Sequence, residues 1–225
     1  MRKNIFLALM LIGSFSLRAQ RITLTEIVRE IESQKVIDEI GYGKEKIKYT
    51  DIQGTPYFSK IFINARIGDT SEWIPIRYDT FLDRIEILYK TDVYELPRKE
   101  SLAEFTFEKT NEKLVFLDSS DEYAGYYFQI ASGQNRILKK VQTKFYNAIP
   151  APNHMIAGTP PRFVKQDPIY FLKNQEVIIK LPKHAKELPS LIPQRKSELQ
   201  SFIKSNKIKT NNEADLIKFA NFLNK

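Results

Sequence analysis

The sequence predicts an α+β protein: a mainly antiparallel β meander, forming a curved sheet, a sandwich or a partial barrel, followed by C-terminal helices. Between about residues 58 and 181, apolar side chains recur at every second position, which is typical of half-buried strands. Short polar connections separate these segments, which favours antiparallel neighbours over crossover units. Beyond residue 181 the apolar residues recur at helical spacing instead.

Composition narrows the classes of protein that are possible. The chain has 225 residues and no cysteine, with 42% hydrophobic and 28% charged positions. These values exclude a disordered chain, a collagen-like repeat and a helical membrane bundle. The absence of thiols excludes cysteine nucleophiles, redox motifs and cysteine-ligated metals. We expect a signal peptide in residues 1–19, a β-rich domain in 20–181 and a basic helical segment in 182–225 packed on that domain.

The first twenty residues resemble a secretory signal. Arg2 and Lys3 precede an apolar run over residues 5–15, and Ala19 stands at a suitable cleavage position before Gln20. The run is too short to span a bilayer, although an uncleaved anchor is the alternative. We therefore expect an exported protein, periplasmic or secreted and outer-membrane associated, with no transmembrane segment in the mature chain.

Several local signals place the individual elements. Thr25 is expected to cap a short first helix, and the run from Gly54 to Tyr57 indicates a turn. Pro193 favours a helix start in the tail, and Asn212 is expected to cap the last helix. The alternating strand residues are Ile74, Ile76 and Tyr78; Ile85, Ile87 and Tyr89; Phe105 and Phe107; Ile137, Val141 and Phe145; and Val177, Ile179 and Leu181.

Positive charge is concentrated in the tail. The chain carries a formal net charge of +8, and residues 180–209 contain eight basic residues against Glu187 and Glu198. Such a patch suits an anionic lipid, an acidic glycan or the acidic face of an envelope protein. Lys204, Lys207 and Lys209 are the candidate contacts. The alternative is a solvated helical face, and export disfavours nucleic acid as a partner.

A proline-rich segment over residues 147–162 is the second candidate contact surface. Long connections without secondary structure are often functional, and prolines lower the entropic cost of binding. The alternative is a rigid strap across one end of the sheet, with Ile156 in the core. The candidate binding residues of this segment are Pro150, Pro152, His154, Met155, Pro160 and Pro161.

Aromatic residues crowd one predicted strand. Tyr126 and Phe128 share a face and Tyr127 points to the other. This pair either packs in the core or forms a stacking surface for a sugar or a lipid.

Catalytic motifs are absent from the sequence. The two histidines form no HExxH pair, and there is no GxSxG elbow. The carboxylate clusters fall between predicted strands, where turn chemistry explains them, with a calcium site or a glycosidase-type pair as alternatives. These clusters are Asp118, Asp121 and Glu122, and Asp79 with Asp83. We assign no catalytic residue, metal or cofactor.

Three short motifs carry a resemblance. Residues 54–57 (GTPY), 74–78 (IPIRY) and 85–87 (IEI), together with the lysine-rich tail from Leu188, resemble an uncharacterised family of secreted proteins of Bacteroidetes-type bacteria. Asp79 departs from this pattern, in which an asparagine follows Arg-Tyr. The resemblance implies export and lineage, and it assigns no activity.

These observations favour a non-catalytic envelope or surface accessory protein that binds a protein partner or an anionic envelope component. The alternative is a periplasmic carrier whose curved sheet holds an apolar small molecule such as a lipid. A third hypothesis is an exported carboxylate-dependent hydrolase.

Overall fold

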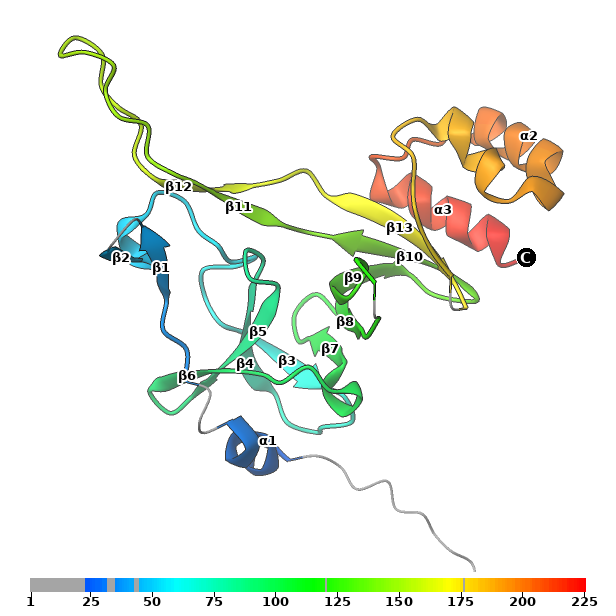
Figure 1. Cartoon of the computed structure of the whole chain (residues 1–225). Helices are drawn as coiled ribbons and strands as arrows, with labels where there is room; N and C mark the ends of the chain where they lie inside the picture. Colours follow the sequence, from blue (N-terminus) through cyan, green and yellow to red (C-terminus); the bar gives the residue numbers. More distant parts are fainter. Residues whose placement is uncertain (1–22, 32–34, 43–44, 120, 176) are drawn as a thin grey trace, which may run out of the picture.

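A computed structural model describes residues 23–31, 35–42, 45–119, 121–175 and 177–225 (Figure 1). The signal peptide expected in residues 1–19 lies outside the described residues. The helices are α1 (Leu24–Ile31), α2 (Lys196–Asn206) and α3 (Glu213–Leu223), with 3-10 turns η1 (Tyr49–Asp51), η2 (Glu100–Leu102), η3 (Ala185–Leu191) and η4 (Pro193–Arg195). The strands are β1 (Glu39–Tyr42), β2 (Glu45–Lys48), β3 (Ile63–Ile67), β4 (Ile74–Asp79), β5 (Arg84–Tyr89), β6 (Asp92–Glu95), β7 (Glu104–Phe107), β8 (Lys113–Leu117), β9 (Gly125–Ala131), β10 (Asn135–Lys140), β11 (Thr143–Tyr146), β12 (Arg162–Lys165), β13 (Ile169–Asn174) and β14 (Val177–Lys180).

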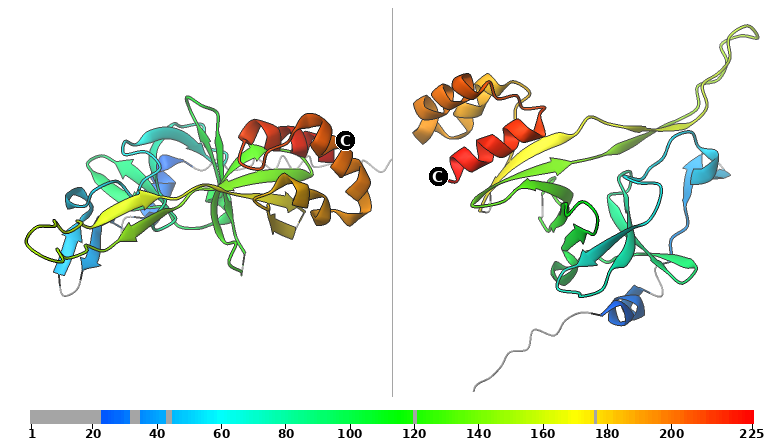
Figure 2. Two further views of the ribbon diagram at one scale, coloured as in Figure 1. Left: turned by 90° about the horizontal axis from the view of Figure 1, so that it is seen from above. Right: turned by 180° about the vertical axis from the view of Figure 1, so that it is seen from behind.

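The fold is a mainly antiparallel sheet with C-terminal helices, as the alternation predicts. Ten strands form one sheet in the order β14-β13-β10-β9-β8-β7-β3-β4-β5-β6, and every neighbouring pair is antiparallel. The edge strands β14 and β6 each have one neighbour, so the sheet is open. The two ends of the sheet run at a large angle to each other (Figures 1 and 2).

The predicted alternation of buried and more exposed side chains is observed on the central strand β4. On β4, Ile74, Ile76 and Tyr78 are all at most 3% exposed. Val177 is 58% exposed, because β14 is an edge strand with a single neighbour. The alternation expected from Ile137 to Phe145 is divided, since β10 ends at Lys140 and β11 begins at Thr143.

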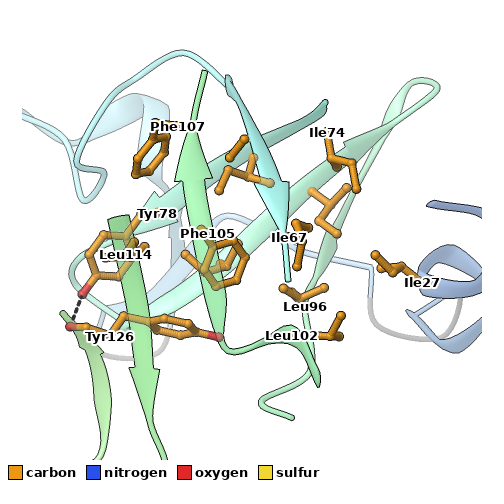
Figure 3. Packing of buried hydrophobic residues seen from close by; sticks show 14 of the residues in the cluster. Ile27, Ile67, Ile74, Tyr78, Leu96, Leu102, Phe105, Phe107, Leu114 and Tyr126 are labelled. Atoms are coloured by element: carbon orange, nitrogen blue, oxygen red, sulfur yellow. Dashed lines mark hydrogen bonds between the residues drawn. The ribbon is translucent and has the colours of Figure 1, made fainter. Parts of the chain in front are cut away.

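The main hydrophobic core lies on one face of the sheet, under α1 (Figure 3). Tyr126 and Phe128 are each 1% exposed in this core, where the Tyr78 hydroxyl reaches the Tyr126 carbonyl at 3.4 Å. Core packing is therefore the correct alternative for this pair. A stacking surface is wrong, because no ring face is left accessible. Tyr127 packs on the other face with Val115, as expected.

Helix α1 begins with hydrogen bonds from Thr23 rather than the predicted Thr25. The Thr23 hydroxyl accepts a hydrogen bond from the Glu26 amide, and the Glu26 carboxylate accepts one from the Thr23 amide at 2.8 Å. This reciprocal pair is a capping box. The helix buries Ile27 and Ile31 against the sheet.

Helix α3 covers the end of the sheet formed by β9 and β10, and α2 packs on η3 in the same hydrophobic cluster (Figure 2). Phe202 and Phe222 stack between the two helices with ring centroids 4.0 Å apart. The Asn212 side chain accepts a hydrogen bond from the Asp215 amide at 3.1 Å, which confirms the predicted cap. Within the described residues, none of the helices combines the length and the apolar character needed to cross a bilayer.

The end of α3 is tied to the β9–β10 turn by Asn224. Its carboxamide accepts from the Asn135 amide at 2.7 Å and donates to the carbonyls of Ser132 and Asn135 at 3.1 Å. We expect Asn224→Ala to lower the free energy of unfolding by about 1–3 kcal/mol, because it leaves these backbone groups without their partner. Urea denaturation measures this, with the exposed Asn221→Ala as the matched control. Equal effects of the two substitutions would contradict the assignment.

Candidate functional site

The proline-rich segment forms the end of a long hairpin, residues 143–165, which we call the arm (Figure 1). Strands β11 and β12 pair from Thr143–Lys165 to Tyr146–Arg162, and farther out Ile149 and Thr159 exchange two hydrogen bonds of 2.8 Å. At the tip, the Asn153 side chain accepts from the amides of the second and third residues after it. The arm is thus an ordered hairpin that extends the β10–β13 pair.

The root of the arm is anchored to the N-terminal half of the chain. Phe145 and Phe163 pack with Tyr49, Tyr57 and Phe81. Because these five aromatic residues come from distant segments, the direction of the arm depends on long-range packing.

Gly54 allows this close approach. It has a φ of +90°, and a Cβ there would lie 2.3 Å from the Phe163 carbonyl oxygen. The adjacent Gln53 exchanges backbone hydrogen bonds with Pro161 and Phe163. The predicted turn at residues 54–57 therefore begins with a glycine that packs directly against the base of the arm.

The tip of the arm is accessible to solvent. Met155 is 84% exposed and Ile156 is 56% exposed. The strap alternative is therefore wrong, because Ile156 is not in the core. Of the six candidate residues, Pro150, Pro152, His154, Met155 and Pro160 are exposed, and Pro161 is half-buried beside Gln53.

An open cleft of about 1190 Å³ lies between the root of the arm and the basic tail. It is lined by Gln142, Lys144, residues 166–170, residues 180–186 and residues 208–211. Its basic lining residues are Lys144, Lys180, Lys183, His184, Lys186 and Lys209, whereas Asp167 is the acidic one. We call this the basic cleft.

The charges of the basic cleft are accessible and unbalanced. All six basic side chains are exposed, and none of them forms a salt bridge to another described residue. Clustered charges of one sign in a concave surface raise the local concentration of counter-ions. The arrangement is therefore suited to an anionic ligand.

Three of the residues that line the basic cleft are buried, and a hydrogen bond connects two of its segments. Tyr170, Leu181 and Ile208 are buried there. The Thr210 hydroxyl donates to the Lys183 carbonyl at 2.6 Å, which holds the two tail segments together. Burial, followed by the nearby Glu213 carboxylate, raises the pKa of Tyr170 to about 12. Tyr170 thus stays a neutral hydroxyl that donates to Glu213 at 3.2 Å.

The three tail lysines that the sequence suggested as contacts do not all line the basic cleft. Lys209 lines the basic cleft, but Lys204 in the last turn of α2 and Lys207 just after it lie outside its lining. Sequence reasoning missed Lys144, which reaches the cleft from β11. No local signal could have found it, because it is 36 positions before Lys180 in the chain.

Two of the carboxylates noted in the sequence, Asp79 and Asp121, accept hydrogen bonds from turn amides. The Asp79 carboxylate accepts from the Phe81 and Leu82 amides at 2.9 and 3.0 Å, and the Asp121 carboxylate accepts from the Tyr123 amide at 2.9 Å. Both follow the expected turn chemistry.

The Asp83 carboxylate has a different role from that of Asp79. It accepts from the Tyr78 hydroxyl at 2.6 Å and from Lys140 Nζ at 2.7 Å. It therefore fastens the β4–β5 turn to β10. In the part of the chain that the structure describes, no three acidic or histidine side chains gather to hold a metal ion.

No known protein family, curated protein or solved structure matches this chain. The fold and the basic cleft therefore define its class: an open antiparallel β protein with a helical cap, a projecting arm and a cationic concave surface.

Proposed function

We propose that this protein is an exported, non-catalytic binding protein whose basic cleft holds an anionic envelope component, such as a phosphate- or carboxylate-bearing glycan or headgroup. The observation that carries the proposal is the set of six accessible basic side chains against the single acidic Asp167 in one concave surface. The signal-like pattern of residues 1–19 supports export.

The shape and chemistry of the basic cleft favour an extended polyanion. Its volume of about 1190 Å³ exceeds the roughly 300–1,000 Å³ that is usual for drug-sized ligands. Five of the six basic side chains are lysines, which act as flexible point charges and do not impose the planar geometry of an arginine fork. Such a surface accommodates several anionic groups at variable spacing.

Binding is favoured over the two alternatives. A carrier of an apolar molecule needs space inside the curved sheet, but the main core there is filled by side chains at most 5% exposed. A carboxylate-dependent hydrolase needs two carboxylates across a cleft, and Asp167 is the single one that lines this cleft.

Charge reversal in the basic cleft tests the proposal. We expect Lys180→Glu/Lys183→Glu/Lys209→Glu to weaken binding of fluorescent polyphosphate by at least about tenfold, because the local potential changes sign. Fluorescence anisotropy measures the affinity, and its dependence on salt should become shallower in the variant.

The matched control places the same charge change elsewhere. Lys113→Glu/Lys204→Glu/Lys207→Glu alters three exposed lysines outside the cleft lining. We expect this variant to bind within about threefold of the unmodified chain, since none of the three altered side chains lines the cleft. Equal losses in the two variants would refute a localised site.

A further inference from the structure

The tip of the arm carries an exposed apolar surface that the basic cleft does not use. Ile149, Met155 and Ile156 are 59%, 84% and 56% exposed. Large apolar side chains that stand exposed on a projection, and that no other described residue covers, mark an interaction site. We propose that the tip inserts into the surface of an anionic lipid bilayer.

The position of the arm leaves its tip accessible to a flat surface such as a bilayer. It projects beyond the rest of the chain, at the end of the molecule opposite α2 and α3 (Figures 1 and 2). The extended chain from Tyr146 to Asn153 spans at most roughly 25 Å, whereas interfacial segments enter a membrane by only about 5–10 Å. The tip can therefore enter the lipid while the folded body stays outside.

Part of the backbone at the tip is already paired or lacks a donor. Asn153 accepts from the amides of Met155 and Ile156 at 2.9 and 3.1 Å, and Ile149 pairs with Thr159. The prolines at positions 150, 152, 160 and 161 have no amide hydrogen to satisfy. These features reduce the number of backbone donors that have to find a partner in the headgroup layer when the tip enters a bilayer.

The charges around the tip suit an anionic headgroup layer. The sequence contains no Asp or Glu between Glu122 and Asp167, so the whole arm lacks acidic side chains. Arg162 and Lys165 lie at its root, where the Arg162 guanidinium lies 5.4 Å from the ring centroid of Tyr146. An apolar tip on an arm whose charged side chains are all basic therefore suits an anionic bilayer.

Vesicle sedimentation tests the proposal. We expect the chain from Gln20 onward, without the signal-like segment, to bind phosphatidylcholine vesicles that contain phosphatidylglycerol more strongly than phosphatidylcholine alone. Met155→Asp/Ile156→Asp should weaken this binding by at least about tenfold, because it places two charges in the apolar layer. The matched control, Ile61→Asp/Val177→Asp, changes two side chains that are 72% and 58% exposed elsewhere, and it should bind like the unmodified chain.

A second measurement separates insertion from attraction by the basic cleft. Trp73 is the single tryptophan, so Trp73→Phe/Met155→Trp places the only indole at the tip. We expect vesicles with brominated acyl chains to quench its fluorescence, including in the background of the cleft variant Lys180→Glu/Lys183→Glu/Lys209→Glu. Vesicle binding without quenching would overturn insertion and leave the cleft proposal intact. Absence of vesicle binding, with a co-purifying protein lost in the Met155→Asp/Ile156→Asp variant, would assign the tip to a protein partner instead.

Discussion

Raising the pH from 10 to 12 is expected to unfold this protein cooperatively. Among the residues whose burial the structure describes, six tyrosines are buried, and burial is the largest cause that raises the pKa of each hydroxyl above the ordinary value near 10. For Tyr127 and Tyr170 the pKa is raised to about 12. The complete set is Tyr49, Tyr57, Tyr78, Tyr126, Tyr127 and Tyr170.

The direction of the effect follows from the protons that each state holds. Below pH 10 these tyrosines are neutral in both states, so their contribution to stability is complete. Above pH 10 the unfolded chain releases protons that the folded chain keeps. The free energy of unfolding then falls by about 1.4 kcal/mol per pH unit for each tyrosine, until the pH passes the folded pKa. Several such groups together exhaust a typical stability of about 5–15 kcal/mol.

Lys140 opposes this trend to a smaller extent. Burial lowers the pKa of its ammonium group, whereas the Asp83 carboxylate acts in the opposite direction. Between that lowered pKa and the ordinary value of 10.5, the unfolded chain binds more protons than the folded chain, so stability rises with pH there. Because this window ends at pH 10.5, Lys140 offsets the tyrosines only at the start of the range from pH 10 to 12.

Urea denaturation at several alkaline pH values, followed by circular dichroism, measures the loss. The part of the phenolate absorbance that comes from the buried tyrosines should rise in the same transition, because these ionise only when the chain unfolds. Tyr127→Phe removes one ionising group and keeps the ring, and it should make the pH dependence shallower by about one proton. A free energy of unfolding that stays constant between pH 10 and 12 would contradict the expectation.

Glu86→Ala is expected to lower the free energy of unfolding by about 1.5–3 kcal/mol, because it removes the fully buried one of the two carboxylates, Glu86 and Asp38, that Arg77 and Arg84 share. Glu86 is fully buried on β5. Its carboxylate accepts from Arg77 at 2.6 and 2.9 Å and from Arg84 at 2.8 and 3.1 Å. Both guanidinium side chains are only 12% exposed.

An exposed pair provides the control for Glu86→Ala. Glu30 lies 2.7 Å from Lys99, and their side chains are 52% and 50% exposed. Glu30→Ala removes the same carboxylate from a solvated ion pair and should cost less than about 1 kcal/mol. Urea denaturation of both variants measures the difference. A cost for Glu86→Ala as small as that for Glu30→Ala would show that the buried network contributes nothing beyond a surface pair.

Local patterns predicted the elements whose causes are local. Strand β4 buries Ile74 and Ile76 because alternation along one strand determines which side chains share a face. Asn212 caps α3 because its side chain reaches an amide three residues away. The same reasoning placed the α1 cap two residues too late, since Thr25 and Thr23 offer the same chemistry and only Thr23 pairs with Glu26.

The direction of the arm and the set of residues that line the basic cleft depend on contacts between residues far apart in the sequence. The sequence by itself marked residues 147–162 as unusual and the tail as basic. It did not distinguish a strap from an arm, because the direction of the hairpin depends on Gln53 and Gly54, more than 100 positions before Phe163. The tertiary structure alone decided that Lys144 joins Lys180 and Lys209 in one cleft, because pairing between strands brings together charges that the chain keeps far apart.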